Sequence, residues 1–330
     1  MACADGSALL PDNACEHSAC STLTPEQVQQ WRLAGYAFVN GVLPESLVAR
    51  VCEQARSIFS KRTDAQQPGE GIGFPFLNTQ TFGEIDAANE IPLHPRLIAA
   101  VSQLLGVSVD QIMLGQAELW AKVGEPACEG EWAPLQNQDQ RMHMDYPNHY
   151  LTHPAPWNFP EAVTAILYLD GIDGIEGGTG LVPRCGDDDP LYAFPYTMMP
   201  GVADIPWTND RVQTEKHLAQ AFPEVAAFRE GLYRKERTLH YNTGSLLLYR
   251  YDLWHRGRPI VPSARRIVMN LAWRKRTCAH FITSWQQGWA KSMQVATFCA
   301  RCWRTRACKL TFLQVRVATA RHAAESRRPA

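Results

Sequence analysis

Residues 244–257 read GSLLLYRYDLWHRG, and this stretch decides how the second half of the chain is interpreted. Its apolar run, Ser245 to Tyr249, is short and is bounded by turn-rich segments, which predicts a buried β-strand. His255 follows a few residues later, so we expect it just past the end of a core strand. We therefore treat His255 as a candidate functional residue.

Four further apolar runs have the same character. They are short, and turn-rich segments separate them. This pattern predicts a mainly β protein with an antiparallel sandwich or barrel of short strands. The four runs are Ile112 to Val123, Val163 to Leu169, Gly180 to Pro183 and Ile267 to Trp273.

Helices are expected to flank these strands. Thr24 can cap a helix that ends at Gly35, with Pro25 in its first turn and Gln27 completing a capping box. Polar residues and turn formers over 62–92 predict a long loop bordering a pocket. We also predict a short strand at 36–40 and helices at 44–59, 92–105 and 212–233, the last one interrupted or kinked at Pro223.

The composition indicates one sizeable core. The chain has 330 residues, 45% of them hydrophobic, and a formal net charge of -1, which suits one large domain or two small ones and gives no reason to expect nucleic acid. No run approaches the roughly 18 apolar residues of a membrane span. The start of the chain lacks the basic and apolar parts of a secretory signal. We expect an intracellular, cytoplasmic protein whose ten cysteines are reduced.

The two ends of the chain differ from the rest. Residues 1–21 are small and polar, which predicts a disordered leader. From residue 274 to residue 330 there are twelve Lys and Arg residues and one acid, so this part carries +11 and the remainder -12. We assign 276–330 to a basic tail, interpreted as poorly packed or as following a sequence discontinuity near Met293. Binding of nucleic acid or an anionic membrane by this tail is the less favoured alternative.

Three cysteines in the tail form the strongest cysteine pattern in the chain. Cys299 and Cys302 have a spacing found in metal sites, and Cys308 follows closely. Zinc or an iron–sulfur cluster needs a fourth ligand. No residue is an obvious fourth ligand, so this interpretation is weak.

The central chemical motif is His143-Met144-Asp145. In an extended segment, residues two apart project to the same face, so an imidazole and a carboxylate are presented together. A firm metal site needs a third ligand, and His255 is the best candidate. Two histidines and one carboxylate on one face of a metal suit a non-haem Fe(II) oxygenase. His149 and His153 lie close by and could compete as ligands.

An arginine pair strengthens the iron hypothesis. Arg265 and Arg266 open the apolar strand that follows His255, and an arginine there can bind a carboxylate in a bidentate manner. 2-Oxoglutarate requires such a group for its distal carboxylate. We favour Arg266, eleven residues after His255; Arg265 would face the opposite side and is the second choice.

Together these residues resemble the phytanoyl-CoA dioxygenase family of iron- and 2-oxoglutarate-dependent oxygenases. Residues 23–51 look like the family's opening helix–strand–helix. The H-x-D motif at 143–145, the strand carrying His255, and Arg266 match its two metal-binding segments and its cosubstrate arginine. The segment 169–184 is similar to the one that ends in the family's PGSH turn. The resemblance covers roughly residues 22–275.

The resemblance implies a double-stranded β-helix (a jelly-roll, cupin-like core) with flanking helices. It also implies Fe(II) as cofactor, 2-oxoglutarate and O2 as cosubstrates, and a small-molecule substrate. Because related halogenases lack the carboxylate ligand, the presence of Asp145 favours a hydroxylase. A non-catalytic ligand-binding protein on the same barrel is the alternative.

The sequence also departs from the family's pattern. Arg184-Cys185-Gly186 replaces the usual Gly-Ser-His after the proline, and Gly257 stands where some members carry a serine. The insertion at 187–239 is long for the family. Residues 118–122 are expected to line the pocket, but the pattern does not assign them individually.

Overall fold

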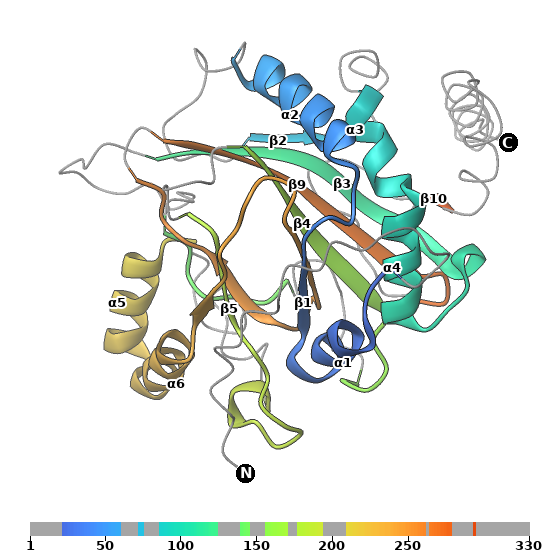
Figure 1. Cartoon of the computed structure of the whole chain (residues 1–330). Helices are drawn as coiled ribbons and strands as arrows, with labels where there is room; N and C mark the ends of the chain where they lie inside the picture. The colour runs from blue at the N-terminus through green and yellow to red at the C-terminus, as the bar shows by residue number, and fades with distance from the viewer. Residues whose placement is uncertain are drawn as a thin grey trace, which may run out of the picture.

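The computed structural model describes residues 22–60, 72–75, 86–124, 139–145, 156–170, 177–193, 209–261, 264–278 and 293–294. Two antiparallel β-sheets and six α-helices make up these parts of the chain (Figure 1). The mainly β fold with flanking helices that the sequence predicts is confirmed. No helix in these ranges has the length and apolar character needed to cross a membrane.

The larger sheet has seven strands, and its longest strands pair at its centre. Strand β9 lies between β4 and β3, each pairing antiparallel with it along most of its length. The order is β1 (Tyr36–Val39), β7 (Leu246–Tyr249), β4 (Ala162–Asp170), β9 (Arg265–Lys275), β3 (Ile112–Val123) and β10 (Met293–Gln294), and β2 (Ile72–Pro75) also pairs with β3.

The smaller sheet has three strands in the order β6 (Arg237–Thr238), β5 (Thr179–Val182) and β8 (Trp254–Gly257). His255 lies inside β8, where it pairs with Leu181 of β5. The expectation that His255 lies just past the end of a core strand is therefore refined. The chain leaves the larger sheet after β7, turns at residues 251–253 and enters the second sheet, which carries the histidine.

Alternation of side chains along the strands separates two environments. In β9, Ile267, Met269, Leu271 and Trp273 belong to the main apolar core, which also includes residues of the N-terminal helices. Arg266, Val268 and Asn270 alternate with these residues along the strand and line a cavity on the other face of the sheet. Successive residues of a strand point to opposite faces, so one strand supplies both the core and the cavity.

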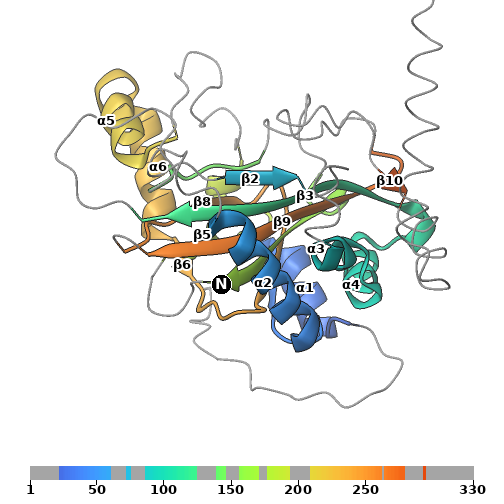
Figure 2. The same ribbon diagram turned by 90° about the horizontal axis from the view of Figure 1, so that it is seen from above.

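Four helices cover the core face of the larger sheet (Figures 1 and 2). The first follows the predicted signals closely, because Thr24 and Gln27 form the expected capping box and Gly35 ends the helix with a φ of 93°. These helices are α1 (Pro25–Ala34), α2 (Glu45–Ser60), α3 (Asp86–Glu90) and α4 (Pro95–Leu105).

Two further helices come from the long insertion at 187–239. Helix α5 (Arg211–Ala221) and helix α6 (Pro223–Arg234) pack against each other near the smaller sheet, away from α1 to α4 (Figure 1). The predicted interruption at Pro223 is confirmed. Proline lacks the N–H that would continue α5, and it starts α6 at its first position.

Some sequence predictions need correction. Residues 62–92 are not one loop, because β2 and helix α3 lie within them and a 3-10 turn at Ile91–Leu93 begins there. The predicted helix at 92–105 begins at Pro95. Strand β10, from the basic tail, pairs with β3 at the edge of the larger sheet. The predicted leader at 1–21 and the rest of the tail beyond residue 278 lie outside the described residues.

Candidate functional site

The two candidate histidine ligands face each other across a single β-bridge. The His143 N–H donates to the His255 carbonyl at 2.9 Å, and the His255 N–H donates to the His143 carbonyl at 2.8 Å. Directly opposite residues of an antiparallel pair place their side chains next to each other. The two imidazole rings are accordingly 4.4 Å apart between centroids. This bridge joins segments that are more than a hundred residues apart in the chain.

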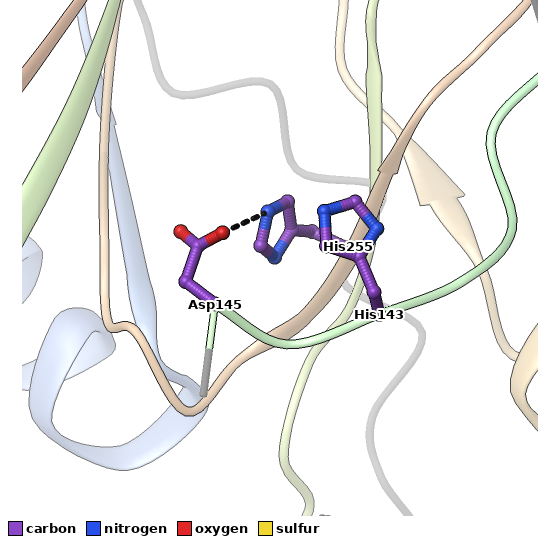
Figure 3. Close-up of side chains that lie close together, drawn as sticks. All are labelled: His143, Asp145 and His255. Atoms are coloured by element: carbon purple, nitrogen blue, oxygen red, sulfur yellow. Dashed lines mark ion pairs between the residues drawn. The ribbon is translucent and has the colours of Figure 1, made fainter. Parts of the chain in front are cut away.

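Asp145 completes the group from the same short segment. It lies two residues after His143, and its N–H donates to the carbonyl of Tyr251 at 3.0 Å, in the turn just before β8. Its Oδ1 is 3.6 Å from Nε2 of His255. One nitrogen or oxygen from each of the three side chains lies within 4.8 Å of the others (Figure 3). Among the residues that the structure describes, this is the only such group.

Backbone carbonyls determine which nitrogen each histidine presents. Nδ1 of His143 lies 3.0 Å from the carbonyl of Arg141, and Nδ1 of His255 lies 2.9 Å from the carbonyl of Leu253. A carbonyl oxygen only accepts, so each Nδ1 carries the proton and each Nε2 keeps a lone pair. Histidine ligands of metals are commonly oriented in this way.

Burial favours the neutral forms of His143 and Tyr249. Burial, with a further contribution from His255, holds the pKa of His143 well below its usual value, so the ring is neutral at neutral pH. Burial and the nearby Asp145 raise the pKa of Tyr249 well above its usual value, so its hydroxyl stays protonated. That hydroxyl donates to Oδ2 of Asp145 at 3.2 Å and leaves Oδ1 facing the histidines.

The donor set fits a first-row divalent metal. Two imidazoles and one carboxylate on one face leave further coordination positions open, which is the arrangement of non-haem Fe(II) sites. The competing candidates His149 and His153 and the cysteine pattern at 299–308 lie outside the described residues.

A cavity of about 200 Å³ extends from this cluster between the two sheets. The three candidate ligands and Arg266 all line it. Arg266 is buried, and its Nε and Nη1 have no hydrogen-bond partner within the described ranges. Burial lowers its pKa, which the nearby hydroxyls of Tyr168 and Tyr241 partly offset. A buried guanidinium with donors to spare is suited to an anion that enters the cavity.

The neighbouring arginine faces the other way. Nη2 of Arg265 lies 3.7 Å from Oδ2 of Asp170, and about a third of its side chain is exposed. The alternation of β9 accounts for this difference, because adjacent residues project to opposite faces. The structure therefore favours Arg266 over Arg265 as the arginine inside the cavity.

Lys122 is a second basic residue in the cavity, and the sequence did not single it out. It lies directly opposite Arg266 in the β3–β9 register, and it is almost fully buried. Its Nζ donates to the carbonyl of Arg258 at 2.9 Å. Burial, followed by the charge of Arg266, lowers its pKa well below the usual value. The sequence placed this strand at the pocket, but only the register identifies the residue that faces Arg266.

Comparison with known proteins identifies the fold. The epimerase SnoN, solved with Fe3+, alpha-ketoglutarate and nogalamycin RO, has a TM-score of 0.51 at 17% identity over 76% of this chain and 82% of its own. The alpha-ketoglutarate-dependent carbocyclase SnoK from nogalamycin biosynthesis has a TM-score of 0.53 at 14% identity over 82% and 92%. EctD from S. alaskensis has a TM-score of 0.51 at 14% identity over 85% and 87%.

The chain has the double-stranded β-helix fold of these non-haem enzymes. At such identities the likeness establishes the fold alone. No protein-family model matches the sequence, and no curated protein sequence matches it either. The chemistry must therefore be argued from the residues of the site.

Proposed function

We propose that this protein is an Fe(II)- and 2-oxoglutarate-dependent dioxygenase of the phytanoyl-CoA dioxygenase family. It would hydroxylate an unactivated C–H bond of a small molecule, with release of succinate and CO2. One observation carries the proposal. The His143, Asp145 and His255 ligand atoms converge at a cavity that also contains the buried guanidinium of Arg266.

In this proposal each residue has a defined task. Nε2 of His143, Nε2 of His255 and Oδ1 of Asp145 would hold the iron, and the backbone carbonyls behind the two rings hold the proton of each neutral ring on Nδ1. Arg266 would bind the distal carboxylate of 2-oxoglutarate by charge-assisted hydrogen bonds. Lys122 lies beside Arg266 in the register and offers a further N–H donor at the same end of the cavity.

Iron bound with 2-oxoglutarate would supply the activation of O2 for attack on a C–H bond. The protein's contribution is to orient the substrate and to keep bulk water from the site. The cavity is suited to this task, because it lies between the sheets and the sheet residues around it are largely buried. The activity is assigned to residues 22–275, the domain expected from the sequence.

The reaction outcome rests on Asp145. A carboxylate in the third ligand position occupies the place where related halogenases bind halide, so its presence favours hydroxylation. SnoN is an epimerase and SnoK a carbocyclase, so the same fold supports other oxidative outcomes. Product analysis by mass spectrometry separates them, because hydroxylation adds one oxygen atom to the substrate.

Succinate release tests the proposal against a non-catalytic binding protein on the same barrel. The purified chain, supplied with Fe(II), 2-oxoglutarate, O2 and pools of metabolites, should release succinate faster with the pool that contains the substrate. Asp145→Ala should abolish this turnover, because the carboxylate ligand is lost. Succinate release by Asp145→Ala equal to that of the unmodified protein would exclude the proposed metal site.

A further inference from the structure

Helices α5 and α6 contact the segment that carries His143 and Asp145 from behind. Two side chains of α6, Arg229 and Tyr233, hydrogen-bond to this segment, and Glu215 on α5 hydrogen-bonds to both of them; we call these three residues the hairpin network. All three belong to the long insertion at 187–239. Their hydrogen bonds to this segment converge on the backbone of one residue, Met142.

Tyr233 holds the peptide unit between Arg141 and Met142. The Met142 N–H donates to the Tyr233 hydroxyl at 3.0 Å. The carbonyl of the same peptide unit, that of Arg141, accepts from Nδ1 of His143 at 3.0 Å. Because a peptide unit is planar, the position of the N–H also sets the direction of the carbonyl. The Tyr233 hydroxyl therefore acts on the orientation of the His143 ring.

Arg229 holds the next peptide unit in the same way. Its Nη2 donates to the Met142 carbonyl at 3.0 Å. The N–H of that unit belongs to His143 and donates to the His255 carbonyl at 2.9 Å. This second bond forms half of the bridge that brings the two histidines together. Both peptide units that flank Met142 are thus fixed on one side by the network and on the other by a candidate ligand.

Hydrogen bonds within the network hold its side chains in place against the two peptide units that flank Met142. Glu215 accepts from Nε and Nη2 of Arg229 at 3.0 and 2.8 Å and from the Tyr233 hydroxyl at 2.7 Å. Arg229 is fully buried. The guanidinium groups of Arg211 and Arg256 lie over the Tyr233 ring, 4.3 and 5.5 Å from its centroid. Arg256 is the neighbour of His255 in β8, so the network also contacts the second ligand strand.

We propose that Tyr233 and Arg229 are positioning residues for the metal centre and that the insertion serves to orient His143. This inference rests on the proposed function only in that it requires a metal at the His143, Asp145 and His255 group. The hydrogen bonds polarise the two peptide units, which strengthens the bond from Nδ1 of His143 and the donor ability of the metal-facing nitrogen.

Titration of the metal-free full-length protein with Co(II) tests this inference without relying on turnover. Tyr233→Phe keeps the ring and its packing but leaves the Met142 N–H without its acceptor. It should weaken Co(II) binding about tenfold, the lower end of the effect of outer contacts on metal affinity, and change the visible spectrum of the bound ion. Arg229→Lys, which keeps the charge, should have an effect in the same direction.

Arg234→Gln is the matched control. Arg234 lies on the exposed side of α6 and pairs only with Glu230 within the described contacts, so this variant should bind Co(II) like the unmodified protein. If Tyr233→Phe is too unstable for titration, Arg229→Lys decides by the same criteria. Unchanged affinity and spectrum in the decisive variant, alongside normal binding by the unmodified protein, would overturn this inference alone. Failure of the unmodified protein to bind, or binding that Asp145→Ala does not weaken, would overturn the proposed metal site as well.

Discussion

Arg266→Met should abolish tight binding of 2-oxoglutarate while leaving the protein at least as stable. Methionine has a similar reach but no charge and no donors. The guanidinium it replaces is buried in the cavity, with Nε and Nη1 unpartnered within the described ranges. Burial lowers its pKa, so the protein surroundings of the guanidinium disfavour its charge. Burying the guanidinium of Arg266 therefore costs free energy of desolvation, which a bound carboxylate would offset.

The expected size of the binding effect follows from the kind of contact that is lost. Truncating one partner of a buried, hydrogen-bonded charge pair costs about 2–5 kcal/mol. At about 1.4 kcal/mol for each factor of ten, this corresponds to a roughly 30-fold to several-thousand-fold weaker affinity. Stability should move the other way or not at all, because the nearby tyrosine hydroxyls only partly compensate this buried charge, and replacing a buried charged group by an apolar side chain of similar volume is often neutral or stabilising.

Two measurements check both parts of this prediction. Calorimetric titration of 2-oxoglutarate into the Co(II)-loaded protein, without O2, gives the affinity. Thermal unfolding of the metal-free protein gives the stability. Arg265→Met is the matched control, since that side chain faces Asp170 on the opposite side of the same strand. It should leave 2-oxoglutarate affinity within about twofold of the unmodified value.

A combined result would refute the reasoning. If Arg266→Met binds 2-oxoglutarate normally while Arg265→Met does not, the assignment of the two arginines is reversed. If Arg266→Met lowers the melting temperature by several degrees, the guanidinium contributes to the fold, and the cavity is not tuned for an incoming anion. Either result would contradict the hypothesis that Arg266 is buried in order to bind the carboxylate of 2-oxoglutarate.

Three further predictions concern the surroundings of the site. Lys122→Met should weaken 2-oxoglutarate binding about tenfold, less than Arg266→Met, because Nζ already donates to the Arg258 carbonyl; the same titration measures it. Tyr249→Phe removes the hydroxyl from Oδ2 of Asp145 and should weaken Co(II) binding several-fold with the cavity otherwise intact; equal affinity would show that the carboxylate needs no such support. Gly124→Ala would place a Cβ 2.1 Å from the Val261 carbonyl oxygen and should lower the free energy of unfolding in urea by about 2 kcal/mol or more.

Local signals predicted the elements that depend on local interactions. The capping box and the terminal glycine of α1 involve residues at most a few positions apart, and the helix forms between them as expected. Strand β3 has the predicted bounds, Ile112–Val123. The break at Pro223 follows from the chemistry of proline itself.

Elements that depend on distant partners were not predictable in this way. Strand β8 consists of Trp254, His255, Arg256 and Gly257, a run without apolar alternation. It is a strand because β5 pairs with it on one side and His143 on the other. Lys122 could be placed opposite Arg266 only from the β3–β9 register, which neither strand reveals alone.

The contacts of the hairpin network with Met142 could not be predicted from the sequence. Tyr233 and Met142 are 91 positions apart, and the tyrosine belongs to an otherwise ordinary amphipathic helix. The motif H-x-D gave the identity of the candidate ligands in that segment. It contained no information on what holds the segment in place.

The local pairing around His143 explains why such support is needed. The segment 139–145 forms only isolated bridges within the described ranges, at Gln140 and at His143, and belongs to no named strand. A strand in the middle of a sheet is hydrogen-bonded to neighbouring strands along its length. This segment instead makes isolated backbone hydrogen bonds to several different partners. Two ligand side chains on so short a segment could change direction with small rotations of the peptide units next to them. Contacts from α5 and α6 to the Met142 backbone restrict those rotations, and so they supply the rigidity that the sheet lacks at this point.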